Sequence, residues 1–348
     1  MEIKDLLLLC IEKGASDLHI TDNEPPILRI DGKLHRTKLE VLSRDNSKKM
    51  IYSILTDPQK EIFEKDLELD FSLALVDLDR FRVNIHIQRG SVEAAFRRVP
   101  LEIPTIESLG LPPIAIELAR KPNGLVLVTG PTGMGKTTTL AAMINLINNE
   151  REALVVCIED PIEFVFTNKK SIIKQREVYS DTRSFAESLR HALRQDPNVI
   201  VVGEMRDLET ISTALTAAET GHLVLATLHT PDAPQTMARI IDVFPPYQQQ
   251  QVKLQLADCL QGVISQLLLP RASGHGRILA TEIMIGTPGI RNLIREQEFA
   301  QILTLMQTGS QHGMCTMDKS LKELTRQGHI TLDIAMSKVK HEEEFKQL

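Results

Sequence analysis

Eight consecutive residues have the types and spacing of a phosphate-binding loop. They read G-x-x-x-x-G-K-T and are Gly130, Pro131, Thr132, Gly133, Met134, Gly135, Lys136 and Thr137. Glycines let backbone N–H groups turn inward around a polyphosphate, and a helix that follows adds the positive end of its dipole. The lysine of such a loop reaches the β- and γ-phosphates, and its threonine hydroxyl binds Mg²⁺. The loop, with the adjacent Thr138, therefore predicts a site for ATP and Mg²⁺.

The flanking residues distinguish this site from a glycine-rich turn that binds nothing. The apolar run 125–128 directly precedes the loop and is typical of a buried strand. The stretch 138–147 directly follows it and has the composition of a helix. Strand, loop and helix thus occur in the order that a phosphate loop needs, which favours nucleotide binding.

Carboxylates follow two later apolar runs. Residues 154–158 lead into Glu159, Asp160 and Glu163, and residues 199–202 lead into Gly203 and Glu204. Open α/β sheets bind ligands at the carboxyl ends of their strands, so we expect these carboxylates near the nucleotide. A carboxylate there can orient a hydrolytic water or hold Mg²⁺. For the first group, a solvated acidic loop is the alternative.

Two histidines flank a further apolar run, residues 223–226. His222 directly precedes this run, and His229 follows it after Thr227 and Leu228. A histidine at a strand end can sense a γ-phosphate by hydrogen bonding, although a lone histidine is more often a structural donor. Zinc is not expected, because neither a cysteine nor a third histidine clusters with them.

Composition limits the class of protein. The 348 residues carry a net charge of −6, and both halves of the chain are mildly acidic. Nucleic-acid binding relies on a concentrated basic surface, so no nucleic acid is expected as a partner, although a local basic groove stays open. The four cysteines are far apart and form no C-x-x-C pair. There is no long apolar run and no signal-peptide pattern at the start, which predicts a cytoplasmic protein.

The first hundred residues predict a separate small domain that mixes helices and strands. Residues 81–88 alternate strictly between apolar and polar, which predicts a strand with Arg82 on its outer face. Residues 92–99 form the next strand, with Phe96 towards the core and Arg97 on the opposite side. Four prolines and a glycine between residues 100 and 113 are typical of a linker. We therefore expect domains at residues 1–99 and 114–348, joined by a linker at 100–113.

The larger domain alternates apolar runs with helical patterns, which indicates a parallel sheet covered on both faces and hence an α/β fold. Residues 247–269 place apolar side chains at helical spacing and predict a helix. Residues 278–284 predict a short strand, and the remaining residues predict a helical C-terminal region.

A resemblance covers the whole chain. Residues 193–207, LRQDPNVIVVGEMRD, are similar almost residue for residue to the signature of the type II/IV secretion-system ATPase superfamily. The resemblance extends from Ala15–His19 and residues 81–84 to the segment 289–296, GIRNLIRE. This last segment is typical of the ATPases that retract type IV pili in twitching motility. Departures from the family pattern occur at Met134, Asn198 and Gly289.

The resemblance implies roles for individual residues. Glu163 matches the family's water-activating base, and Glu204 matches the residue that binds Mg²⁺ and its waters. The sequence leaves open which of these two is the general base. His222 and His229 match histidines that link nucleotide state to domain position. Arg82 and Arg97 match arginines of the N-terminal domain that reach the phosphates and stabilise transferred charge.

The resemblance also implies an assembly. We expect a homohexamer with PAS-like α+β N-terminal domains and RecA-like P-loop ATPase cores, at the cytoplasmic face of the inner membrane. Hydrolysis of Mg·ATP is expected to rotate the domains and deliver torque to a PilC-like inner-membrane platform protein. Pilus-assembly ATPases usually carry extra N-terminal domains and a four-cysteine metal element, both missing here.

Three alternatives stay open. One is an accessory motor (PilU-like) or a type II secretion ATPase; a PilU-like paralogue is also a possible partner. Another is a hexameric nucleic-acid motor, against which the acidic balance, the lack of Trp and the presence of only three Tyr argue. The third is a protein that binds ATP without hydrolysing it, against which Glu163 and Glu204 argue. Ring symmetry, direction of rotation and turnover rate cannot be read from the sequence.

Overall fold

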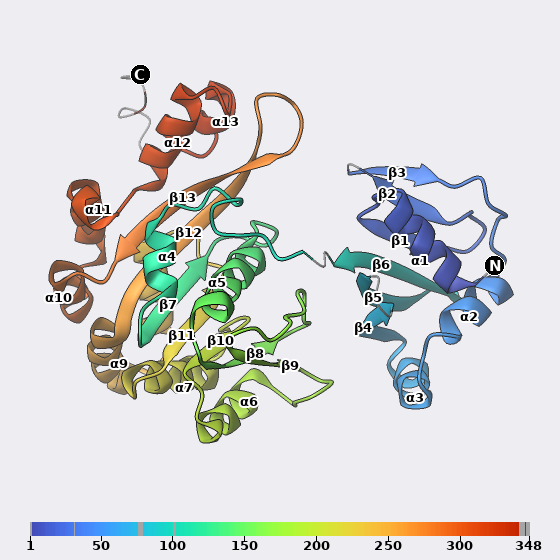
Figure 1. Ribbon diagram of the computed structural model, residues 1–348, viewed down its shortest axis with the longest axis horizontal. Helices are drawn as coiled ribbons and strands as arrows, with labels where there is room; N and C mark the ends of the chain where they lie inside the picture. Colours follow the sequence, from blue (N-terminus) through green and yellow to red (C-terminus); the bar gives the residue numbers. More distant parts are fainter. Residues whose placement is uncertain (1, 31, 76–78, 100–101, 341–344, 346–348) are drawn as a thin grey trace. The chain divides into compact units, whose positions relative to one another are not determined.

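The computed structural model describes residues 2–30, 32–75, 79–99, 102–340 and 345. The chain forms two compact units (Figure 1). The first comprises Met1–Glu102 together with Pro161–Val165, and the second comprises Ile103–Asp160 and Phe166–Leu348. The division falls inside the expected linker at 100–113, of which Pro100 and Leu101 lie outside the described residues.

The first unit is a six-stranded antiparallel sheet with helices. Its strand order is β3-β2-β1-β6-β5-β4. The elements in chain order are α1 (Ile3–Glu12), β1 (Asp17–Ile20), β2 (Ile27–Ile30), β3 (Lys33–Arg36), α2 (Arg44–Tyr52), α3 (Asp57–Asp66), β4 (Glu68–Leu75), β5 (Asp79–Gln88) and β6 (Ser91–Val99). The predicted strands at 81–88 and 92–99 are confirmed as β5 and β6.

Alternation along the strands gives this sheet one apolar and one polar face. Phe81, Val83 and Phe96 are fully buried and pack with apolar residues of all three helices of the unit. The helices begin where the sequence caps them: the Ser43 side chain accepts a hydrogen bond from the Asn46 N–H at the start of α2. The opposite face of the sheet carries polar and charged side chains, among them Arg82 and Arg97.

The second unit is built on a seven-stranded sheet of order β13-β12-β7-β11-β10-β8-β9. All neighbouring strands pair in parallel except β12 and β13, which pair antiparallel. The strands are β7 (Gly124–Thr129), β8 (Leu154–Glu159), β9 (Ile172–Glu177), β10 (Val199–Val202), β11 (Leu223–Leu228), β12 (Leu260–Pro270) and β13 (Arg277–Ile285). The helices are α4 (Ile114–Ala119), α5 (Lys136–Glu150), α6 (Phe185–Ala192), η1 (Leu193–Gln195), α7 (Leu208–Glu219), α8 (Ala233–Asp242), α9 (Pro246–Cys259), α10 (Pro288–Glu296), α11 (Phe299–Thr308), η2 (Ser310–His312), α12 (Met317–Arg326) and α13 (Leu332–Met336).

Two layers of helices cover the central strands. Every residue of β7, β10 and β11 is buried. Residues of α4 and α5 form the apolar core on one face, and residues of α6 to α11 contribute to the core on the other. The predicted parallel sheet, covered on both faces, is thus confirmed.

One predicted element is wrong in part. The helix expected over residues 247–269 ends at Cys259, and the chain continues directly as strand β12 beside β7. The burial of both faces of β12 explains the error, because such a strand shows no alternation between polar and apolar side chains. In the part of the chain that the structure describes, no helix is long and apolar enough to cross a membrane.

Candidate nucleotide site

The loop between β7 and α5 has the backbone of an anion cradle. Gly130, Gly133 and Gly135 all have positive φ angles, of 139°, 79° and 81°. A side chain is disfavoured in such conformations. At Gly130 space is also lacking, since a Cβ atom would lie 2.5 Å from the carbonyl oxygen of Gln266. Helix α5 begins at Lys136, so its unpaired N–H groups lie at the end of the loop.

The ammonium group of Lys136 lies over this loop. Its Nζ donates hydrogen bonds to the carbonyl oxygens of Gly130, at 2.7 Å, and Pro131, at 3.0 Å. The residue is only 8% exposed. Lys136 thus places a buried cation at the loop, which is the property that a polyphosphate site needs.

His229 connects the loop to the neighbouring strand end. Its Nδ1 lies 3.4 Å from Lys136 Nζ and 3.3 Å from Thr132 Oγ1, and its Nε2 lies 3.0 Å from Glu204 Oε2. Because an ammonium group can only donate, Nδ1 must be the acceptor and Nε2 must carry the proton donated to Glu204. Burial, aided by the charges of Lys136 and Arg206, lowers the pKa of His229 and keeps the ring neutral.

Glu204 is the acidic member of this group. It follows β10 after Gly203 and also pairs with Arg206, whose terminal nitrogen lies 2.8 Å from Oε2. The donor set fits Mg²⁺: a carboxylate and the Thr137 hydroxyl are hard oxygen ligands, and nucleotide phosphates supply further oxygens. Among the described residues no group of three or more His, Cys, Asp or Glu could hold a metal ion alone. A Mg²⁺ bound largely by phosphate and water needs no such group.

The structure therefore brings together Thr132, Lys136, Glu204 and His229 within the second unit. It does not bring His222 to them. His222 precedes β11, whose six residues span about 20 Å, and its Nδ1 contacts the carbonyl oxygen of Ala217, 3.0 Å away. Its predicted role is thus not supported by proximity to the loop.

The other predicted residues belong to the first unit. Glu163 lies in the segment Pro161–Val165, which groups with that unit. Arg82 and Arg97 are exposed and face each other in register on β5 and β6. Their predicted place on the face opposite Phe81 and Phe96 is confirmed.

Sequence reasoning missed several polar residues. Gln266 donates to the Met134 carbonyl of the loop, and Arg206 pairs with Glu204. On the first unit, Asp17 pairs with Arg97. For Gln266 a signal existed, because Ser265 and Gln266 interrupt an apolar run.

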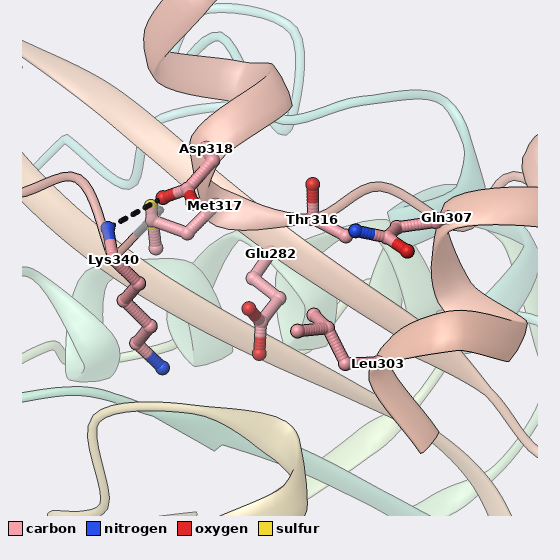
Figure 2. A pocket seen from close by; sticks show the side chains of 7 residues that line it. All are labelled: Glu282, Leu303, Gln307, Thr316, Met317, Asp318 and Lys340. Atoms are coloured by element: carbon pink, nitrogen blue, oxygen red, sulfur yellow. Dashed lines mark hydrogen bonds between the residues drawn. The ribbon is translucent and has the colours of Figure 1, made fainter. Parts of the chain in front are cut away.

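A small cavity elsewhere in the second unit is built around a buried carboxylate (Figure 2). Glu282 accepts a hydrogen bond from the Ala233 N–H, 2.8 Å away, at the start of α8. Burial raises the pKa of Glu282. Asp318 accepts from the backbone N–H of Lys340 at 3.0 Å. Glu282 thus satisfies a backbone N–H at the start of α8, and Asp318 satisfies the backbone N–H of Lys340, so both carboxylates have a structural role. The residues lining the cavity are Glu282, Leu303, Gln307, Thr316, Met317, Asp318 and Lys340.

Known proteins resemble the chain over its whole length. It is 49% identical over 345 residues to the type IV pilus retraction ATPase PilT of Pseudomonas aeruginosa, covering 99% of this chain and 100% of that one. It is 39% identical over 337 residues to the type IV pilus ATPase PilU of the same organism, covering 97% and 88%. The crystal structure of the pilus retraction motor PilT with bound ADP matches it with a TM-score of 0.94, 48% identity and full coverage of both chains.

These comparisons confirm the predicted fold class, an α/β RecA-like ATPase core with a smaller α+β domain. The model of the type II/IV secretion system protein family matches residues 2–336. The chain belongs to this family of type II/IV secretion system proteins.

Proposed function

We propose that this chain is a motor ATPase that hydrolyses Mg·ATP to retract type IV pili. The observation that carries the proposal is the hydrogen-bonded group of Lys136, His229 and Glu204, built on a glycine loop of the phosphate-binding type. The group links the phosphate cradle to two neighbouring strand ends. A change at the γ-phosphate therefore reaches β10 and β11 through one imidazole. The identity of 49% with a retraction ATPase, over both whole chains, supports pilus retraction as the work performed.

The residues have distinct proposed tasks. Residues 130–138 bind the phosphates, and Lys136 neutralises their charge. Bound Mg²⁺, held by Thr137 and Glu204, would polarise the phosphoryl oxygens. Glu163 takes a proton from the attacking water, and hydrolysis proceeds by in-line attack without a covalent intermediate.

Charge from the first unit completes the proposed site. Arg82 and Arg97 supply positive charge to the transferring phosphoryl group in the working ring. His229, at the loop, couples nucleotide state to domain position, and for His222 the same role rests on the family resemblance alone. In this proposal the motor is a homohexamer at the cytoplasmic face of the inner membrane, acting on a PilC-like platform protein and alongside a PilU-like paralogue. No nucleic acid takes part.

An accessory PilU-like motor is the second candidate. The identity of 39% with PilU, against 49% with PilT, favours the main retraction motor. A complementation experiment distinguishes the main motor from the accessory motor. Expressed alone in a piliated strain lacking both ATPases, a main motor restores retraction, whereas an accessory motor restores it only together with a main one.

The biochemical test is ATP hydrolysis by the purified chain. We expect Mg²⁺-dependent phosphate release by the wild type and loss of at least about a hundredfold in Lys136→Ala, which removes the cation of the cradle. Chelation of Mg²⁺ with EDTA should stop hydrolysis and be reversed by added Mg²⁺. Substantial hydrolysis by Lys136→Ala would refute the site.

A further inference from the structure

Gln266 is a buried amide in the strand beside the phosphate loop. It lies in β12, next to β7, and is only 1% exposed. Its Nε2 donates to the carbonyl oxygen of Met134, 2.6 Å away. Its Oε1 accepts from the hydroxyl of Thr139, in the first turn of α5, at 3.0 Å. The side chain of Gln266 thus connects strand β12 to the phosphate loop and to helix α5, which follows the loop.

The chemistry of its partners fixes which way the amide points. The carbonyl oxygen of Met134 can only accept, so the NH₂ group of Gln266 must face it. The carbonyl group of Gln266 then faces Thr139, whose hydroxyl donates to it. With both ends engaged in a dry environment, the amide has one orientation that satisfies all partners.

The bond to Met134 also determines the direction of the next N–H group. In a planar trans peptide, the C=O of one residue and the N–H of the next point in opposite directions. Because Gln266 holds the Met134 carbonyl on the strand side, the N–H of Gly135 points the other way. Gly135 directly precedes Lys136, so this N–H is one of those that form the cradle.

Without that bond, the peptide between Met134 and Gly135 is free to flip. Gly135 has a φ of 81°, and glycine rotates through such conformations at little cost. A flipped peptide would turn a carbonyl oxygen towards the phosphates in place of an N–H donor. The exchange replaces an attraction for the anion with a repulsion.

Other contacts tie the same strand to the loop. The backbone N–H of Leu268 donates to the sulfur of Met134 at 3.2 Å. The backbone of Gln266 approaches Gly130 so closely that no Cβ fits between them. Strand β12 thus contacts the loop at Gly130 and at Met134.

We propose that Gln266 is a positioning residue that holds the Met134–Gly135 peptide with its N–H towards the β-phosphate. The proposal rests on the proposed nucleotide site. It predicts a selective effect: removing the donor weakens ligands that have a β-phosphate and leaves AMP binding unchanged. A merely structural role of Gln266 would lower stability without this selectivity.

The test measures binding of ADP and AMP to the full-length protein, with a fluorescent ADP analogue and competition by AMP. Gln266→Met keeps the approximate shape and removes both the donor to Met134 and the acceptor for Thr139, and we expect ADP affinity to fall about tenfold. Gln266→Glu should lower ADP affinity further, because a carboxylate oxygen, which can only accept a hydrogen bond, then faces the Met134 carbonyl. Ser265→Ala is the matched control: Ser265 is also buried in β12, but it bonds Thr129 at 2.8 Å and not the loop. Its ADP affinity should match the wild type.

Lys136→Ala separates the two proposals. If Lys136→Ala binds ADP normally, the nucleotide site itself is wrong. If Lys136→Ala loses ADP while folded Gln266→Met and Gln266→Glu keep wild-type affinity, only the role of Gln266 is overturned. Equal losses for ADP and AMP would also overturn it. Should the Gln266 variants melt below the assay temperature, Thr139→Val leaves Gln266 in place and removes its anchor. Its ADP affinity should fall about threefold, and an unchanged value would count against the proposal.

Discussion

Asp17 holds Arg97 across the strand pair β1 and β6. The two residues are partners in register, and Oδ1 of the carboxylate lies 2.9 Å from Nε of the guanidinium. The Asp17 side chain is buried, whereas 71% of the Arg97 side chain stays exposed. Asp17 therefore orients the guanidinium of Arg97 through Nε, while most of the Arg97 side chain stays accessible to solvent. Arg82 lies next in register on β5, so two exposed arginines occupy adjacent strands of one face.

Arg97→Ala should lower kcat more than nucleotide affinity. If Arg97 stabilises charge that develops during phosphoryl transfer, its loss affects the transition state more than the bound ATP. We expect kcat to fall at least about tenfold, with the dissociation constant for ADP changed less than about threefold. Paired ATPase kinetics and ADP titrations check this, with a melting curve as the folding control. An unchanged kcat in the folded protein would leave Arg97 a surface arginine.

Asp17→Asn should destabilise the first unit in a pH-dependent way. Burial alone would raise the pKa of Asp17, but hydrogen bonds from Ser16 and Arg97 outweigh it, so the pKa of Asp17 is lowered. A lowered carboxyl pKa means stabilisation that is present above the unfolded pKa, near 4, and lost as the pH falls through the folded value. At pH 7 the substitution should cost about 1–3 kcal/mol of unfolding free energy.

Urea unfolding of wild type and Asp17→Asn at a series of pH values measures this difference. The difference in unfolding free energy between the wild type and Asp17→Asn should be constant from about pH 8 to pH 5 and should decrease below about pH 4. A gap that widens on acidification would contradict the assignment. Asp57→Asn is a suitable control, because Asp57 pairs with Lys60 on the surface at 3.0 Å, an arrangement worth little.

Local sequence predicts the phosphate loop because its chemistry is local. The glycines, Lys136 and Thr137 act through a continuous stretch of backbone, so spacing alone identifies them. Contacts between distant segments are a different matter. His222 and His229 lie at opposite ends of the same apolar run, so the sequence does not distinguish their roles. The length of β11 places only His229 at the loop.

Strand β12 shows where pattern reading fails. Its apolar residues occur at spacings that fit a helix as well as a strand buried on both faces, and pairing with β7 decides between them. With the strand missed, the contact of Gln266 with Met134 could not be foreseen. The pairing of Asp17 with Arg97 likewise joins residues eighty positions apart. Such contacts depend on topology, which no local pattern contains.

Glu163→Gln and Glu204→Gln should separate the base from the metal-binding residue. An amide keeps the shape of the carboxyl group but cannot accept a proton, so Glu163→Gln should bind Mg·ATP and lose turnover by at least about a hundredfold. Glu204→Gln should weaken the Mg²⁺ dependence of binding as well, because Glu204 is the proposed metal ligand. Nucleotide titrations with and without Mg²⁺, beside single-turnover hydrolysis, distinguish the two. If Glu163→Gln fails to bind Mg·ATP, Glu204 becomes the candidate base.

Arg291 should stabilise the second unit by closing the end of helix α9. Its guanidinium donates to the carbonyl oxygens of Ala257, Asp258 and Leu260 at the end of α9, and to that of Gly286. The carbonyls of Ala257 and Asp258, in the last turn of α9, have no partner within the helix, and the positive charge also complements the negative end of the helix dipole. Arg291→Ala should therefore cost about 2–4 kcal/mol of unfolding free energy, since several part-buried acceptors lose their donor at once.

Arg295 provides the comparison on the same helix, α10. It pairs with the exposed carboxylate of Asp258 at 2.7 Å, so Arg295→Ala should cost less than about 1 kcal/mol. Arg291→Lys should recover only part of the lost stability. The guanidinium donates to four carbonyls from three nitrogens, whereas a lysine has a single ammonium group, which cannot reach all of these carbonyls at once. Denaturant unfolding of the three variants measures the order, and ADP titration shows whether the nucleotide site is affected. Equal stabilities for Arg291→Ala and Arg295→Ala would mean that the carbonyls at the end of α9 are satisfied equally well by water.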